Sequence, residues 1–343
     1  MRVNLVGLVA LWLVACAAEQ PGASKTNDAA GAKRIETVEV DGAAISALAP
    51  PSCGESGTES VGALLGYMEG DEPGTLVVFA HGYGQTVELA WRHHVERTVR
   101  PGVAVVTTDY RDNLGFPTLQ GAHDTIAATL LAKQRFESIE SVILLGVSMG
   151  GAISGTAIPE STHVTGDGSS LFDFWINVEG VSQLAETWAE ASAVGSPAAD
   201  DIARDAGGTP ADCPEAYVRR APVERAWEMS LAGLKAAAVV HGMNDGTVPS
   251  NQGREMAQAL AAAAIPTQMF SVLRPAEGQS AGTTGTGALG LGAVDDFLLI
   301  SGHGWEGDEH HPVIRTGFEV LEGLLDGSYD AAKLYAEHVV DDG

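Results

Sequence analysis

The sequence has few basic residues, few cysteines and no run of apolar residues long enough to span a bilayer. Only 19 Lys and Arg residues stand against 45 Asp and Glu residues, so the 343-residue chain carries a formal charge of -26. Proteins that bind nucleic acid present a basic surface to the phosphates, and this balance argues against such a partner. It also disfavours adsorption to anionic lipid head groups. The simplest interpretation is an acidic surface that keeps the protein in solution.

The longest apolar run is N-terminal and covers Val3–Ala15, with the single polar residue Asn4. A transmembrane helix needs about 20 residues, so this run instead fits the hydrophobic part of a secretory signal. It ends in LVAC, which resembles a bacterial lipobox, and the resemblance implies that Cys16 is lipidated and becomes the mature N-terminus. An ordinary signal peptide with an incidental Cys16 is the alternative.

These features predict an exported protein, lipid-anchored in the bacterial cell envelope at the periplasm or the cell surface. Residues 1–15 form the expected signal peptide. Residues 16–34 are small, polar and aperiodic, which is typical of a flexible tether. Residues 35–343 are expected to fold as one domain, whose contact with a membrane is through the lipid anchor alone.

With Cys16 lipidated, Cys53 and Cys213 remain of the three cysteines. An exported protein meets an oxidising compartment, where such a pair can form a disulfide. In the chain-entropy model, a bridge that closes so long a loop stabilises the fold by at most about 4–5 kcal/mol. Two unpaired thiols are the alternative.

Apolar segments bounded by turn residues alternate with helix-like segments along the body of the chain. Most of these apolar segments are continuous, as expected of strands buried on both faces. The alternation predicts an α/β fold with a mostly parallel central sheet flanked by helices. The expected strands are Thr75–Ala80, Val103–Thr108, Ser141–Gly146, Phe172–Val178, Ala236–His241 and Thr267–Leu273. The expected helices are Val87–Val99, Gly121–Phe136, Gly150–Ile158 and Gln252–Ala264.

Two segments break this alternation. Residues 180–233 are helix-rich and lie between two strands, which predicts a small helical cap over the strand ends. The cap carries apolar side chains and also Arg219, Arg220 and Arg225. Residues 277–292 look like a long loop and contain a formal G-x-G-x-x-G at 285–290. No strand precedes this motif and no helix follows it, so we expect no dinucleotide site and no cofactor.

The strongest catalytic signal is GVSMGG at residues 146–151, directly after an expected strand and directly before an expected helix. A sharp strand–turn–helix connection exposes its central side chain, here Ser148, near a helix N-terminus. The flanking glycines leave room for the turn. The pattern predicts a nucleophile, and a glycine-rich turn with an idle serine is the alternative.

A second motif, HGYG at residues 81–84, follows the expected strand Thr75–Ala80. An HG-x-G loop after an early strand, followed by a serine elbow, resembles the α/β-hydrolase superfamily. The resemblance implies that the backbone N–H groups of Tyr83 and Met149 form an oxyanion hole. It also implies that His81 shapes the loop and is not the catalytic base.

A third motif, HGMNDGTVP at residues 241–249, matches the stretch of this superfamily that carries the triad acid, which implies Asp245 in that role. Asp109 and Glu179 also follow expected strands and are its rivals. Some hydrolases take the acid from the strand before the cap, which here implies Glu179. The role of the acid is to hold the imidazole in the correct tautomer and to stabilise its charged form.

The base follows the acid in this superfamily, which leaves His303, His310, His311 and His338. His303 lies in SGHGW, where small neighbours suit a loop that delivers an imidazole to the elbow, and we predict His303. The pair His310–His311 lies in an acidic loop, and His338 is expected in a C-terminal helix. About 30 residues precede this base after the last expected strand, more than the superfamily pattern has. Adjacent histidines rarely share one metal, so no metal site is expected.

The resemblance covers roughly residues 64–325. The stretch from RAPVERAW through DGTVPSNQ also resembles the hydrolase part of prolyl-oligopeptidase-like enzymes, although Ala221 replaces the usual Ser before Pro222. Fewer than 300 residues precede the elbow, so the propeller of those enzymes is not expected. The predicted function is a serine hydrolase that cleaves a small-molecule ester or other acyl substrate through an acyl-enzyme. The alternatives are a prolyl-oligopeptidase-like peptidase and a non-catalytic surface lipoprotein with a hydrolase fold.

Overall fold

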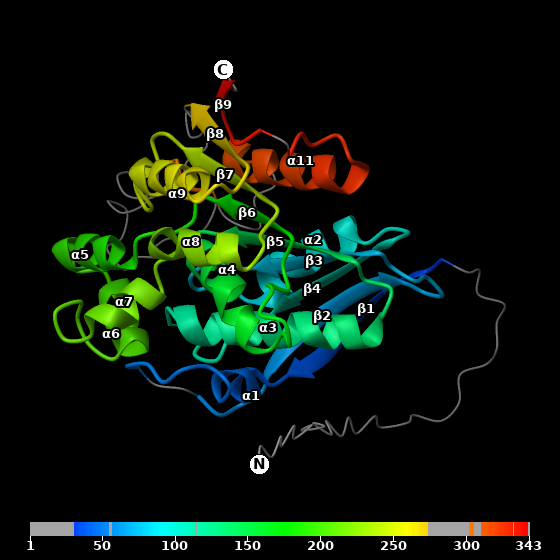
Figure 1. Ribbon diagram of the computed structural model, residues 1–343, viewed down its shortest axis with the longest axis horizontal. Helices are drawn as coiled ribbons and strands as arrows, with labels where there is room; N and C mark the ends of the chain where they lie inside the picture. The colour runs from blue at the N-terminus through cyan, green and yellow to red at the C-terminus, as the bar shows by residue number, and fades with distance from the viewer. Residues whose placement is uncertain are drawn as a thin grey trace, which may run out of the picture.

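In the part of the chain that the structure describes, nine strands form one twisted sheet between two layers of helices (Figure 1). The computed structural model describes residues 31–54, 57–113, 115–273, 302–304, 310–331 and 333–341. The strand order is β1-β2-β4-β3-β5-β6-β7-β8-β9. The two pairs that involve β2 are antiparallel, and every other neighbouring pair is parallel. The predicted α/β-hydrolase fold is confirmed.

The strands are β1 (Lys33–Val40), β2 (Val61–Met68), β3 (Thr75–Ala80), β4 (Val103–Thr108), β5 (Ser141–Val147), β6 (Phe174–Val178), β7 (Ala236–Gly242), β8 (Thr267–Leu273) and β9 (Tyr335–Asp341). The helices are α1 (Gly42–Ser46), α2 (Arg92–Thr98), α3 (Thr118–Arg135), α4 (Met149–Glu160), α5 (Leu184–Val194), α6 (Ala198–Ala206), α7 (Pro214–Arg219), α8 (Ala226–Leu231), α9 (Ser250–Ala262) and α11 (Pro312–Asp326), with a π-helical turn η1 (Val87–Trp91) and 3₁₀ turns η2 (Ser161–His163) and η3 (Pro222–Arg225).

The two faces of the sheet bury separate apolar layers. Helices α3, α4, α8 and α9 pack on one face, where Ile126 and Trp175 are almost fully buried. Helices α2 and α11 cover the other, where Phe79 of β3 stacks on Trp91 with ring centroids 4.6 Å apart. Continuous apolar runs such as TLVVFA are needed because the central strands are covered on both sides.

The expected strands and helices appear with small shifts of their ends, whereas the edge strands β1 and β9 and the neighbouring strand β2 were not predicted. Strand β1 begins at Lys33, inside the segment expected to be a tether. The C-terminal segment around His338 is strand β9, so the predicted helix there is wrong. Side chains of β9 alternate between exposed and half-buried. This alternation is typical of an edge strand covered on one face.

The predicted cap is formed by α5, α6 and α7, which lie together at one end of the sheet in Figure 1. Leu184 and Ile202 of the cap pack in the same apolar cluster as Ala80 and Met149, which lie at strand ends. Helix α8 was also expected in the cap but packs on the sheet through Met229. The cap therefore covers the carboxyl ends of the parallel strands, where ligands bind in such sheets.

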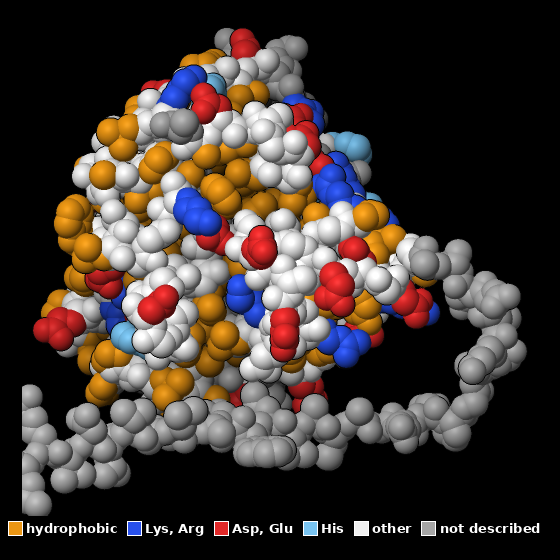
Figure 2. Space-filling view, turned by 45° about the vertical axis from the view of Figure 1, so that its right-hand side comes forward, with side chains coloured by type: hydrophobic (Ala, Val, Ile, Leu, Met, Phe, Trp, Pro, Cys, Tyr) orange, Lys and Arg blue, Asp and Glu red, His pale blue; other side chains and the backbone are white. Residues whose placement is uncertain are grey.

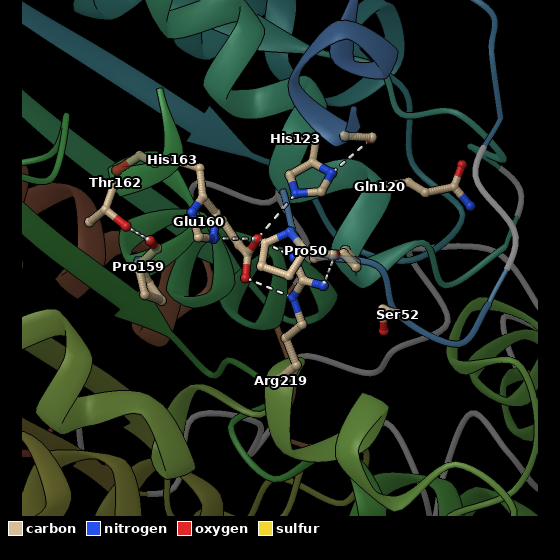
Figure 3. A network of polar contacts seen from close by, with 12 residues as sticks. Pro50, Ser52, Gln120, His123, Pro159, Glu160, Thr162, His163 and Arg219 are labelled. Atoms are coloured by element: carbon tan, nitrogen blue, oxygen red, sulfur yellow. Dashed lines mark hydrogen bonds and ion pairs between the residues drawn. The ribbon is translucent and has the colours of Figure 1, made fainter. Parts of the chain in front are cut away.

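The three arginines noted in the predicted cap, Arg219, Arg220 and Arg225, form largely buried ion pairs. Arg220 pairs with Asp205 at 2.8 Å, and Arg219 and Arg225 both pair with Glu160 at the end of α4, at 2.6 and 2.7 Å. Figure 3 shows Glu160 between His123 and Arg219, with Arg219 also reaching Pro50. The network joins the segment after α1, helices α3 and α4, the cap helix α7 and the turn η3.

The carboxyl of Glu160 is 1% exposed. Burial alone raises its pKa, but hydrogen bonds from His123 and Arg219 and the charge of Arg225 hold the pKa well below its usual range. Burial also lowers the pKa of His123, against the effect of Glu160. A neutral His123 donates from Nε2 to Glu160 and accepts the hydroxyl of Ser46 at Nδ1, at 3.3 and 2.8 Å.

The predicted disulfide is not formed in the structure, where Cys53 and Cys213 are free thiols. The Cys213 thiol donates to the carbonyl of Gly207 at 3.5 Å, and a Cβ on Gly207 would lie 2.9 Å from the Cβ of Cys53. The neighbouring Cys53 raises the pKa of the Cys213 thiol. The two cysteines therefore both lie near Gly207, but their sulfur atoms are not bonded to each other.

The predicted signal peptide and the lipidated Cys16 lie outside the described residues and stay predictions, as does the interpretation of residues 277–292. Among the described residues, no helix has both the length and the apolar character needed to cross a membrane. On the face shown in Figure 2, acidic side chains are scattered singly among apolar and uncharged ones, in keeping with the charge of -26.

Candidate active site

Ser148 lies at a strained turn between β5 and α4. Its backbone angles are φ 55° and ψ -122°, which a non-glycine residue adopts only where the surroundings enforce it. A Cβ on Gly150 would lie 2.0 Å from the carbonyl oxygen of Ala80, and a Cβ on Gly146 would lie 2.2 Å from Ser154 Oγ. The glycines of the motif therefore allow β3, β5 and α4 to meet at the serine.

We expect Gly150→Ala to destabilise this turn, by about 1–3 kcal/mol for an overpacked site, and to lower serine reactivity because the contact with Ala80 is backbone and cannot rotate away. The matched control is Gly166→Ala, where a Cβ meets nothing within 4 Å. Urea unfolding and the rate of labelling by a fluorophosphonate measure the two effects. Equal stability and labelling rate in the two variants would contradict this account of the turn.

The structure brings together Ser148 after β5, Asp245 after β7 and His303 of the segment 302–304. His303 Nε2 is 3.0 Å from Ser148 Oγ, and His303 Nδ1 is 2.7 Å from Asp245 Oδ2. The side chains of His303 and Asp245 are 3% and 0% exposed. A carboxylate only accepts hydrogen bonds, so Nδ1 carries the proton and Nε2 accepts from the serine hydroxyl.

Asp245 is fixed by its own turn. Its Oδ1 atom accepts hydrogen bonds from the backbone N–H groups of Thr247 and Val248 at 2.8 and 2.9 Å. These bonds leave Oδ2 for the imidazole. His241 Nε2 lies 2.8 Å from the carbonyl of Val248, and burial lowers the pKa of His241, so this neighbour is neutral and donates to that carbonyl.

Glycines on both sides of His303 let its loop, residues 302–304, pack closely. Gly302 has φ +85°, and a Cβ there would lie 2.6 Å from the carbonyl of Asn244. The other candidate bases lie elsewhere. His310 is exposed, the buried His311 precedes α11, and His338 stacks on Phe270 in the edge of the sheet.

The two rival acids have different positions. Asp109 accepts a hydrogen bond from the backbone N–H of Val87 and lies 3.8 Å from His81, and burial raises its pKa. Glu179 is fully buried and lies 3.8 Å from His303 Nδ1, while its Oε2 atom accepts the N–H of Gly304 at 3.0 Å. Asp245 is therefore the carboxylate bonded to the imidazole.

The predicted oxyanion residues flank the elbow. Met149 is the first residue of α4, and the loop after β3 touches the elbow where Gly150 meets Ala80 and His81. The Tyr83 hydroxyl donates to Asp201 of α6 at 2.5 Å, and burial together with Asp201 raises the pKa of Tyr83. The loop after β3 that carries Tyr83 is thus tied to the cap.

His81 is fully buried and stacks on Tyr110 with ring centroids 4.1 Å apart. The Tyr110 hydroxyl donates to the carbonyl of His81 at 3.2 Å. Burial lowers the pKa of His81 to about 4, so it is neutral near pH 7. Its contacts are with Tyr110, next to the loop after β3, and the loop-shaping role implied for His81 stays a prediction.

Glu179, Asp245 and His303 place donor atoms within 4.8 Å of one another, a set that suits a divalent cation in kind. Hydrogen bonds already account for each of these positions, and we assign no metal here. The sequence marked Glu179 only as a rival acid. Its bond to the loop of His303 depends on the fold, because 125 positions separate Glu179 from Gly304.

The mostly parallel sheet carries a serine on a strained elbow, hydrogen-bonded to a histidine that is in turn hydrogen-bonded to an aspartate, and this arrangement defines an α/β-hydrolase of the serine type. The family model described as the prolyl oligopeptidase family matches residues 119–291, and the chain belongs to this family. The match includes Ser148 and Asp245 and ends before His303. The likeness to prolyl-oligopeptidase-like enzymes expected from the sequence is confirmed. No curated protein matches the chain significantly.

Solved structures with a similar fold include both esterases and peptidases. Carboxyl esterase 2 of Tuber melanosporum is 15% identical with a TM-score of 0.54, over 90% of this chain and 89% of the esterase. An esterase of Pyrobaculum calidifontis is 16% identical with a TM-score of 0.53, over 87% and 86%.

A puromycin-hydrolyzing peptidase of Mycobacterium tuberculosis is 18% identical with a TM-score of 0.52, over 85% of this chain. The chain spans only 41% of the length of that peptidase, and 36% of an acylaminoacyl peptidase of Pyrococcus horikoshii. At these identities the likeness concerns the fold.

Proposed function

We propose that the protein hydrolyses carboxylic esters, with Ser148 as nucleophile, His303 as general base and Asp245 as the acid that orients the imidazole. The observation that carries the proposal is the hydrogen-bonded series Ser148–His303–Asp245 on a strained elbow. A serine hydroxyl is a weak nucleophile on its own and becomes effective when a positioned base removes its proton.

In the proposed reaction, Ser148 Oγ attacks the acyl carbon while His303 Nε2 takes the hydroxyl proton. Collapse of the tetrahedral intermediate breaks the bond to the leaving oxygen, and His303 returns the proton to the alkoxide. Water then attacks the acyl-enzyme with His303 again as base, which releases the acid and restores Ser148. Asp245 stabilises the imidazolium that forms at each stage.

Backbone N–H groups of Tyr83 and Met149 are the proposed donors to the oxyanion. Each such donor contributes about 3–4 kcal/mol to transition-state stabilisation in a serine hydrolase. The position of Met149 at the N-terminus of the 12-residue helix α4 supports its part, because unpaired N–H groups and the helix dipole favour negative charge there.

Two considerations favour an ester over a peptide. An alkoxide leaves more readily than an amine, so the active site must supply less transition-state stabilisation to cleave an ester than to cleave an amide. The esterases among the similar structures are also matched over most of their own length. The peptidase alternative is supported by the family match and by the similarity to a puromycin-hydrolyzing peptidase.

The test is a pair of substrates with one short acyl group, presented as an aryl ester and as the matching anilide. We expect kcat/KM for the ester to exceed that for the anilide by about 10³-fold, or about 4 kcal/mol in transition-state free energy. Blocked peptides serve as a third substrate. A kcat/KM for the anilide or a peptide equal to that for the ester would favour the peptidase. No turnover of any substrate by the folded protein would favour a binding function.

A further inference from the structure

A second buried carboxylate, that of Glu179, lies beside the imidazole of His303. Its side chain is 0% exposed, and its Oε2 atom is 3.8 Å from His303 Nδ1. The same nitrogen is 2.7 Å from Asp245 Oδ2. One imidazole nitrogen therefore has two carboxylates close to it, one bonded and one just beyond hydrogen-bond distance.

Glu179 also holds the loop that carries His303. The N–H of Gly304, the next residue after the histidine, donates to Glu179 Oε2 at 3.0 Å. On its other side Gly304 packs against α11, where a Cβ would lie 2.6 Å from Ile314 and 2.7 Å from His311 Nδ1. The loop is thus clamped between α11 and one carboxyl oxygen of Glu179.

The backbone at Glu179 is itself strained. Its φ is +42°, a conformation that residues other than glycine seldom adopt, and its N–H donates to the carbonyl of Val240 at 2.7 Å. The following Gly180 leaves no room for a side chain against Asn177. Strain of this kind persists where the surrounding structure enforces it, and it concentrates at functional sites.

We propose that Glu179 is a positioning residue for His303 and a substitute acid for its Nδ1 atom when Asp245 is lost. This inference rests on the proposed serine hydrolase function. Through Gly304, Glu179 sets where the imidazole stands relative to Ser148. Through the nearness of Oε2 to Nδ1, it provides a second acceptor for the imidazole proton.

The positioning role is tested with Glu179→Ala and Glu179→Gln. The alanine variant loses the acceptor for Gly304, and we expect kcat for an ester to fall by about 10–100-fold with KM changed by less than threefold, because a small displacement of a catalytic group acts on the chemical step. The glutamine amide oxygen still accepts that N–H, so Glu179→Gln retains at least about half of kcat. Full kcat in Glu179→Ala, or an equal loss in both variants, overturns this role.

The substitute role is tested with Asp245→Asn. Its amide presents a donor to Nδ1–H, and the wrong tautomer that results costs about 10⁴-fold in kcat where no other acceptor exists. With Glu179 close by, we expect Asp245→Asn to lose only about 10²-fold. We expect the double variant Asp245→Asn/Glu179→Gln to lose about 10⁴-fold, because a neutral amide oxygen is a weaker acceptor for Nδ1–H and does not stabilise the charged imidazolium. This is a coupling that a double-mutant cycle isolates. Equal activity of the single and double variants overturns the substitute role.

A readout that does not need turnover separates this inference from the proposed function. In the full chain labelled with ¹⁵N-histidine, a downfield Nδ1–H signal of His303 bonded to a carboxylate should persist in Asp245→Asn and disappear in the double variant. Loss of that signal in the single variant overturns the inference whether or not the protein hydrolyses esters. A wild-type protein that shows the signal but neither turns over esters nor reacts with a fluorophosphonate counts against the proposed function alone.

Discussion

Replacing Ser148 with alanine in the full chain is expected to abolish covalent labelling by a fluorophosphonate and to lower kcat for an ester by about 10⁶-fold, or about 8 kcal/mol. Both effects follow from one atom, because Oγ is the group that His303 Nε2 meets at 3.0 Å. The phosphonate is attacked by an activated serine and forms a stable adduct. Intact mass of the labelled protein and initial rates on an aryl ester measure the two effects.

The control for this substitution is Ser169→Ala, which changes an exposed serine remote in sequence from the elbow. It should be labelled to the same extent as the wild-type protein and hydrolyse the ester at the same rate. Undiminished labelling of Ser148→Ala would place the nucleophile elsewhere. Labelling lost without any loss of ester turnover would show that Ser148 reacts with the probe but does not carry the hydrolysis.

Replacing Glu160 with alanine is expected to lower the free energy of unfolding by about 3–5 kcal/mol. The carboxylate is 1% exposed and pairs with Arg219 and Arg225 at 2.6 and 2.7 Å, and it also accepts from His123 at 3.3 Å (Figure 3). Its removal leaves two largely buried guanidinium groups without this partner. Urea unfolding at pH 7 measures this loss of stability. The substitution itself should leave the distances at Ser148 unchanged.

Glu228→Ala is the matched control, because Glu228 pairs with the same Arg225 at 2.6 Å but is 54% exposed. We expect a loss of at most about 1 kcal/mol there. A loss as large as that of Glu160→Ala would mean that burial does not set the difference.

The effect of Glu160 should also depend on pH. Since its folded-state pKa lies below its ordinary value of 4.5, its ion pairs stabilise fully above that pH. The stability difference between wild type and Glu160→Ala should therefore narrow as the pH falls below about 4.5. A difference that instead widens in acid would contradict the lowered pKa.

The central sheet could be predicted from sequence because each of its buried strands is a continuous apolar run bounded by turn residues. That signal is weaker in the strands at and next to the two edges of the sheet. Strand β2 contains two glycines, and β9 is half exposed, so its period was mistaken for that of a helix. What makes these segments strands is pairing with a neighbour distant in the chain, such as Thr267 with Tyr335, and no local pattern encodes that pairing.

The candidate triad could be named because a nucleophile elbow, an HG-x-x-D turn and a glycine-flanked histidine each carry a local backbone requirement. Ser148 needs Gly146 and Gly150 beside it, and His303 needs Gly302. Glu179 and Glu160 have no such local requirement. A carboxylate that bonds a loop 125 residues away, or two arginines 59 and 65 residues away, reveals its role only when the fold brings its partners to it.

The hydroxyl of Tyr83 donates to Asp201 of the cap helix α6, while the backbone of the same residue lies in the loop after β3, where we propose one of the oxyanion donors. Asp201 is bonded in turn to Arg204, which reaches Asp112 in the loop after β4. A cap that swings away to admit a substrate must break this chain of contacts or take the Tyr83 ring with it. The position of the Tyr83 ring is therefore coupled, through Asp201, to that of the cap helix α6.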